Sequence, residues 1–231
     1  MKPDVTDIIV EPDTIALFAL TEFLLSLIPG PAVLLVIGLS MRQGFRIGFM
    51  ATLGVLFTNA VFFTLSALGV GALILASATL FAILKWIGAA YLVYLGIGMI
   101  APLAKRLRGR RPSEKGLTLD NARQAAPKAR QTALRSFWRG FSLQASNPKN
   151  LAFFVAILPQ FIAPDGHIAL QMVVLGALSI LIELPILVVY GAASAYSARM
   201  MRKRIIEWIE AVGGAILIAL GGALASSQRG P

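Results

Sequence analysis

The chain has 231 residues, of which 57% are hydrophobic and only 14% are charged, and its net charge is +10. A soluble globular domain carries about a quarter charged residues, so this composition excludes that class and indicates a membrane protein. The chain has no cysteine, which excludes a disulfide scaffold, a thiolate metal site and a cysteine nucleophile.

Six apolar stretches are each near the ~20 residues that a helix needs to cross a bilayer. They lie at 14–39, 47–75, 80–103, 137–162, 168–197 and 205–225. The sequence therefore predicts an all-α polytopic membrane protein with six transmembrane helices, embedded in a lipid bilayer as its permanent environment.

The basic residues alternate along the connections between these spans. The first, third and fifth connections are basic, whereas the second and fourth contain no lysine or arginine. The positive-inside rule then places both termini outside the inner membrane of a bacterial cell. The expected regions are an extracytoplasmic tail at 1–13, a first three-helix repeat at 14–103, a basic cytoplasmic linker at 104–136, a second three-helix repeat at 137–225 and a tail at 226–231. Because anionic lipids attract such a linker, no nucleic-acid partner is expected.

The first span is interrupted at Pro29-Gly30-Pro31, in the middle of its apolar run. Proline removes a backbone donor and clashes with the preceding turn, so the helix must break or kink there. Inside a bilayer the freed backbone groups need partners, so the break must be buried in protein or line a cavity. The fourth span has a second interruption, at Asn147-Pro148-Lys149. Interruptions in matching positions of two halves point to the substrate site of a transporter.

The two halves of the chain also share a glycine pattern in their third spans. Gly88 and Gly96 have counterparts in Gly213 and Gly221. Because each half has three spans, the halves must face opposite ways, which predicts two inverted three-helix repeats. The same glycines are typical of helix-packing faces, either within one chain or in a homodimer through the sixth span.

Polar residues at membrane depth are costly and are therefore the candidate functional residues. Glu22 lies two helical turns before Pro29, on the same face of the first span. Asn59 and Glu183 lie in the middle of the second and fifth spans, and Lys149 lies at the second break.

A broken helix exposes amides at the start of one half-helix and carbonyls at the end of the other. The amides, with Lys149, would hold a carboxylate, and the carbonyls, with Asn59 or Asn147, would hold an ammonium. Either Glu183 or Glu22 would bind and release a coupling proton. Two alternatives stay open: a structural Lys149–Glu183 ion pair, and a Glu22 that is only hydrogen-bonded or faces the headgroups. The expected substrate-binding residues are Pro29, Gly30, Pro31, Asn59, Asn147, Pro148 and Lys149.

Several motifs, taken in order, carry a family resemblance. They are Pro29-Gly30-Pro31, the turn Gln43-Gly44-Phe45-Arg46-Ile47-Gly48, the stretch 84–96, the stretch 147–154 and Leu158-Pro159-Gln160-Phe161. Together they resemble the LysE/RhtB superfamily of bacterial inner-membrane exporters of amino acids and related metabolites. The chain departs from that pattern at Ala32, where the family usually has Asn or Asp, and at Thr58-Asn59, where it often has Gly-Asp. If that aspartate carries protons in relatives, the role would fall here to Glu22 or Glu183, or be absent.

The resemblance and the paired breaks predict a proton-coupled secondary transporter that exports amino acids or related small metabolites. The spans contain no serine–histidine pair, metal cluster or paired acidic motif, so neither an enzyme nor a metal site or cofactor is expected. The alternatives are a passive pore, a non-transporting membrane scaffold, or export of a compound that is not an amino acid.

Overall fold

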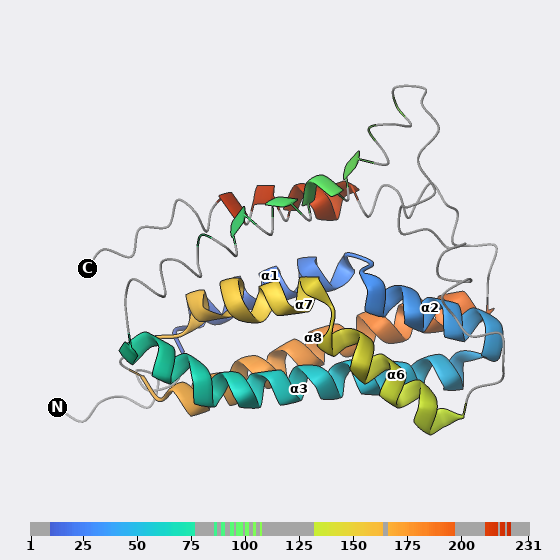
Figure 1. Ribbon diagram of the computed structural model, residues 1–231, viewed down its shortest axis with the longest axis horizontal. Coiled ribbons are helices and arrows are strands. Elements are labelled where there is room, and N and C mark those ends of the chain that lie inside the picture. The colour runs from blue at the N-terminus through green and yellow to red at the C-terminus, as the bar shows by residue number, and fades with distance from the viewer. Residues whose placement is uncertain are drawn as a thin grey trace.

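A computed structural model describes residues 10–76, 132–163 and 166–196, together with scattered positions at 86–107 and 211–222. Every secondary-structure element in this part of the chain is a helix (Figure 1), which confirms the all-α class. Most of the expected linker, residues 1–9 of the first tail, the whole second tail and most of the third and sixth spans lie outside the described residues. The count of six spans and the inverted repeat therefore stay predictions.

The first expected span, 14–39, is observed as two half-helices, α1 (Pro12–Leu27) and α2 (Pro31–Gln43), which are bent by 51° at the break. Together they are long and apolar enough to cross a membrane. Pro31 occupies the first turn of α2, where its missing N–H costs nothing because that donor has no partner inside a helix anyway. The predicted break is therefore confirmed.

Two long helices follow the two breaks. α3 (Phe45–Ala76) matches the expected span at 47–75, and α8 (Ile168–Tyr196) matches the one at 168–197. Both contain a stretch long and apolar enough to cross a membrane. Gly44 makes the tight turn between α2 and α3 with a φ of 91°, a left-handed conformation that favours glycine.

The expected fourth span, 137–162, consists of four short pieces. They are α6 (Ala133–Ala145), α7 (Pro148–Ala152), the π-helical turn η2 (Phe153–Ile157) and the 3₁₀ turn η3 (Leu158–Phe161). α6 thus begins inside the stretch expected to be linker. The second break, between α6 and α7, is where the sequence predicts it.

Glycines let α3 and α6 pack backbone against backbone. A methyl group added to Gly54 would collide with the carbonyl of Phe137, and one added to Gly140 would collide with the carbonyl of Ala51. This close approach fixes α6 along α3 just before the second break, so it sets where that break lies in the bundle.

The two broken helices run in opposite directions. In Figure 1 the chain passes from left to right through α1 and α2, and from right to left through α6 and α7. Beyond the breaks, α1 packs against η2 and η3 through Phe18, whose ring centroid lies 6.2 Å from that of Phe153 and 5.2 Å from that of Phe161. This antiparallel arrangement is what an inverted repeat requires of its first helices.

The described residues of the third and sixth spans show what their glycines contact. A methyl group on Gly96 would collide with the carbonyl of Gly214 and with Ile218, and one on Gly213 would collide with Ile28 at the first break. Gly96 and Gly213 therefore lie at packing contacts within one chain, which leaves the prediction of an inverted repeat untested.

Candidate functional site

The two breaks meet. A Cβ atom built on Gly30, between α1 and α2, would lie 3.6 Å from Cδ of Lys149 and 3.9 Å from Nδ2 of Asn147. Residues more than a hundred positions apart in the sequence are thus in van der Waals contact, as a shared site requires.

A small cavity lies at this meeting point. Its open space is about 40 Å³, enough for a few water molecules, so a larger solute needs the helices to move apart. The predicted site residues among its lining are Glu22, Gly30, Asn59, Asn147, Lys149 and Glu183. The three predicted prolines, Pro29, Pro31 and Pro148, shape the breaks but are not lining residues.

Lys149 reaches across from the second break to the first. Its Nζ donates hydrogen bonds to the carbonyl of Leu25, at 2.5 Å, and to that of Ile28, at 3.1 Å. These carbonyls lie at the end of α1, where a cation interacts favourably with the helix dipole. Among the described residues Lys149 forms no ion pair with Glu183, in contrast to the alternative of a buried ion pair.

A third carbonyl at the end of α1 also has a distant partner. The hydroxyl of Tyr190, on α8, donates to the carbonyl of Leu27 at 2.8 Å. Side chains from α7 and α8 therefore bind three carbonyls at the end of α1, of which that of Leu25 also accepts the backbone N–H of Ile28. These bonds anchor the end of α1 to both helices.

Side-chain amides form a hydrogen-bond chain from α8 to the second break. Asn59 donates through Nδ2 to Oε2 of Glu183 at 2.5 Å, and Gln144 donates through Nε2 to Oδ1 of Asn59 at 3.0 Å. Asn147 donates through Nδ2 to Oε1 of Gln144 at 3.0 Å, and its own Oδ1 accepts the backbone N–H of Lys149 at 3.1 Å. The chain thus ties α8, α3 and α6 to the start of α7.

The second carboxylate has a different kind of partner. Oε1 of Glu22 accepts a hydrogen bond from the hydroxyl of Ser179 at 2.7 Å. Ser179 lies one turn before Glu183 on α8, so both carboxylates approach the cavity beside the same helix face. Both glutamates are buried, with exposed fractions of 6% for Glu22 and 9% for Glu183.

The start of α2 contributes backbone donors. Ala32 and Val33 line the cavity, and their N–H groups belong to the first turn of the helix, which has no acceptor inside it. The cavity therefore has the positive end of the α2 dipole on one side and two carboxylates on another. Such a site can hold a small solute that carries charges of both signs.

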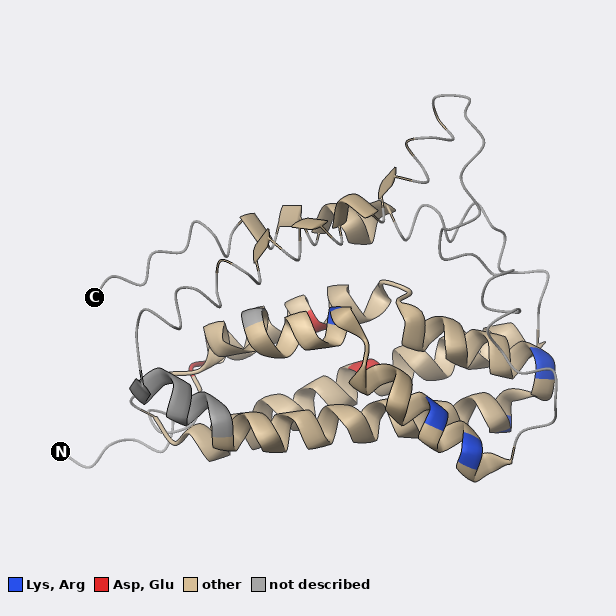
Figure 2. Cartoon of the chain, in the orientation of Figure 1, with Lys and Arg blue, Asp and Glu red and all other residues tan. Residues whose placement is uncertain are grey.

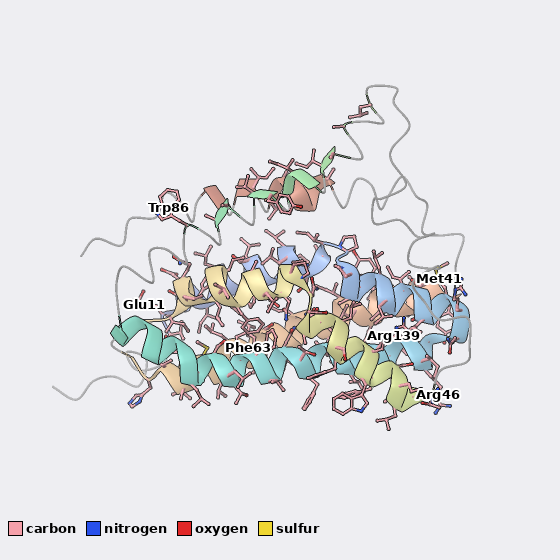
Figure 3. All side chains as sticks on the ribbon, viewed as in Figure 1. Glu11, Met41, Arg46, Phe63, Trp86 and Arg139 are labelled. Atoms are coloured by element: carbon pink, nitrogen blue, oxygen red, sulfur yellow. The ribbon has the colours of Figure 1, made fainter. Side chains whose placement is uncertain are left out.

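Charged side chains are sparse along the helices. In Figure 2 acidic and basic colours come together near the middle of the bundle, and the remaining basic residues collect at its right-hand end. Figure 3 places Arg46 and Arg139 at that end and Glu11 at the other. The central group matches the cavity, and the basic end matches the side that the charge pattern predicts to be cytoplasmic.

A family model described as LysE type translocator matches residues 23–228. The chain belongs to this family. The resemblance drawn from the sequence motifs is therefore confirmed, and the match covers both breaks and every lining residue of the cavity except Glu22. No solved structure matches the chain.

Two of the three relatives described next span most of this LysE type translocator, and the third spans about two thirds of it. An uncharacterized membrane protein of Pseudomonas aeruginosa is 34% identical over 206 residues, which cover 87% of this chain and 89% of the relative. A homoserine/homoserine lactone efflux protein of Salmonella typhimurium is 30% identical over 214 residues, 92% of this chain and 96% of the relative. A leucine efflux protein of Enterobacter is 30% identical over 145 residues, 63% of this chain and 62% of the relative.

Sequence reasoning missed five polar residues at or beside this candidate site: Ser26, Gln144, Asn150, Ser179 and Tyr190. Gln144 had a usable signal, since it is a buried amide three residues before Asn147 and one helical turn away. Ser179 and Tyr190 gave none, because hydroxyl residues are common in transmembrane helices and only the packing of α8 against α1 brings them to the break.

Proposed function

We propose that this protein is a secondary transporter that exports amino acids or related small metabolites from a bacterial cell, coupled to protons, with its substrate site in the cavity between the two broken helices. Its family membership and the names of two relatives, which act on homoserine, homoserine lactone and leucine, support the substrate class.

One observation carries the location of the site: both breaks open onto the same buried cavity. The starting N–H groups of α2 suit a substrate carboxylate, and the carboxylates of Glu22 and Glu183 suit an ammonium. Lys149 now binds the carbonyls of α1, so it balances the glutamate charges without blocking the amides.

The same basic end supports the proposed orientation in the inner membrane. Arg42 and Arg46 flank the turn between α2 and α3, and Arg135 and Arg139 lie on α6. Placing that end in the cytoplasm puts both termini outside. The cavity is buried, so the helices must move before it opens toward either side of the membrane.

Everted membrane vesicles with an acidic interior test this proposal, because export then becomes uptake. A panel of radiolabelled amino acids, beginning with homoserine and leucine, is expected to include at least one whose uptake the pH gradient drives uphill. Uphill uptake is lost in Lys149→Met and Glu183→Gln, and it persists in Leu181→Ala, a matched change on the exposed face of α8.

Two results would contradict the proposal. Uptake that only equilibrates and survives both site variants indicates a passive pore. Wild-type vesicles that accumulate no amino acid above the level of vesicles without the protein would overturn the substrate class.

A further inference from the structure

The two buried carboxylates differ in the hydrogen bonds that hold them, and this difference assigns them different roles. Resting on the proposed function, we infer that Glu22 carries the exchangeable proton, whereas Glu183 stays ionised and receives the ammonium of the substrate.

The hydrogen bond between Asn59 and Glu183 has a fixed direction. At the far end of the amide chain the backbone N–H of Lys149 can only donate, so Asn147 must present its oxygen to it. Each amide then has to donate onward, from Asn147 to Gln144, from Gln144 to Asn59, and from Asn59 to Glu183. Oε2 of Glu183 therefore faces a group that can only donate, so this oxygen does not carry a proton, and the bond is strongest, as a charge-assisted bond, when Glu183 is ionised.

The hydrogen bond between Ser179 and Glu22 can run in either direction. A serine hydroxyl both donates and accepts, and its hydrogen rotates to suit its neighbour. The hydroxyl of Ser179 donates to an ionised Glu22, and it can accept the proton of a neutral Glu22 without any heavy atom moving. Glu22 can thus change its charge while it keeps its partner.

The charge balance of the cavity allows one such proton. The charged residues among its lining are Lys149, Glu22 and Glu183, which sum to one net negative charge when all three are ionised. Since a net charge at membrane depth is costly, the empty cavity is stable with one proton bound. The only other titratable side chain on the helix face of α8 toward the break is Tyr190, whose hydroxyl is already bound to the carbonyl of Leu27.

The exchange step balances in atoms and charge. A substrate ammonium arrives at the carboxylate of Glu183, the O–H bond of Glu22 breaks, and its proton leaves for water. The cavity then holds two ammonium groups, those of Lys149 and the substrate, and three carboxylates, those of Glu22, Glu183 and the substrate. The carboxylate of the substrate lies at the positive end of the α2 dipole, which offsets part of the one remaining negative charge. Proton and ammonium thus replace each other in the cavity, and no further reactant is needed.

Purified protein in liposomes tests this assignment with two assays on the same radiolabelled amino acids. Counterflow measures the exchange of substrate without a pH gradient, and driven uptake measures coupling. In Glu22→Gln we expect driven uptake to fall by at least an order of magnitude, while counterflow stays measurable and loses its dependence on pH. In Glu183→Gln we expect both to be lost.

Ser179 provides a second pair of variants that does not alter either carboxylate. Ser179→Ala removes the hydroxyl and is expected to shift the pH profile of driven uptake, whereas Ser179→Thr keeps the hydroxyl and the profile. A purely structural serine would change the amount of folded protein and leave the shape of the profile unchanged.

The outcomes separate the two levels of the account. Wild-type protein without counterflow of any amino acid overturns the proposed function itself. Two other results leave the transporter in place and overturn the assignment of the proton to Glu22, provided that the wild type shows counterflow. One is driven uptake by Glu22→Gln, and the other is a Glu183→Gln variant that loses only coupling.

Discussion

The two breaks differ in how their backbone groups find partners. At the second break Asn147 caps the start of α7 with its own side chain, so that break is locally complete. At the first break Gly30 provides no side-chain cap, and the carbonyls at the end of α1 depend on Lys149 and Tyr190 from distant parts of the chain. The first break therefore supplies exposed backbone dipoles, and the second supplies the side chains that bind them.

Removing the Lys149 ammonium tests this difference most severely. Lys149→Met leaves the carbonyl of Ile28 without its side-chain donor in a buried site, which costs about 1–3 kcal/mol, whereas the carbonyl of Leu25 keeps the backbone N–H of Ile28 and loses less. We expect loss of uphill transport and a clear fall in the thermal midpoint of the protein in detergent. Lys149→Arg, which keeps the charge, is the control, and equal stability of the methionine variant and the wild type would contradict the role of Lys149 at α1.

A larger side chain at Gly30, in the first break, has the next largest expected effect on transport. A methyl group at Gly30 makes an ordinary contact with Lys149, so Gly30→Ala is expected to fold and to retain transport. Gly30→Leu places its larger side chain in a cavity that holds only a few waters. We expect normal insertion and at least an order of magnitude less counterflow. Full activity of Gly30→Leu would show that substrate passes elsewhere.

Cutting the amide chain tests the locally complete break. Gln144→Met removes the donor to Asn59 and the acceptor for Asn147 while nearly keeping the volume. Since two buried polar groups lose a partner, we expect the free energy of unfolding to fall by about 1–3 kcal/mol and transport to weaken. Measurements of thermal midpoint and counterflow together check this, and Gln144→Glu tests whether the direction of the chain matters.

The smallest expected effect belongs to Tyr190. Tyr190→Phe removes one hydrogen bond to the carbonyl of Leu27 and keeps the ring, which costs about 1 kcal/mol. Transport is expected to stay close to that of the wild type. A loss as large as that of Lys149→Met would mean that the hydroxyl, and not the ammonium, secures the end of α1.

The breaks were predictable because proline acts locally. Pro31 and Pro148 each occupy the first turn of a new helix, and Pro29 precedes the first of them, although Pro185 lies inside α8 without ending it. Membrane depth makes the backbone groups that a break frees costly. The same reasoning marked Glu22, Asn59 and Glu183, since ionisable and amide groups inside an apolar span need partners.

The partners themselves were not predictable, because they depend on packing between distant helices. From the sequence, the candidate partners of Lys149 were a substrate carboxylate and Glu183. In the structure Lys149 binds carbonyls of α1 instead, because the close packing of α3 and α6 at Gly54 and Gly140 sets where the second break lies. Ser179 and Tyr190 were unpredictable for the same reason, because only the packing of α8 against α1 brings them to the break.

The central claim is that the substrate occupies the space between the two breaks, and cysteine labelling tests it most directly. The chain has no cysteine, so Gly30→Cys is a unique thiol in an otherwise native protein. A small charged thiol reagent is expected to modify it, and a saturating transported amino acid is expected to slow that reaction by at least an order of magnitude, while Leu181→Cys on the exposed face of α8 shows no such protection. A labelling rate at position 30 that the transported substrate leaves unchanged would contradict the account.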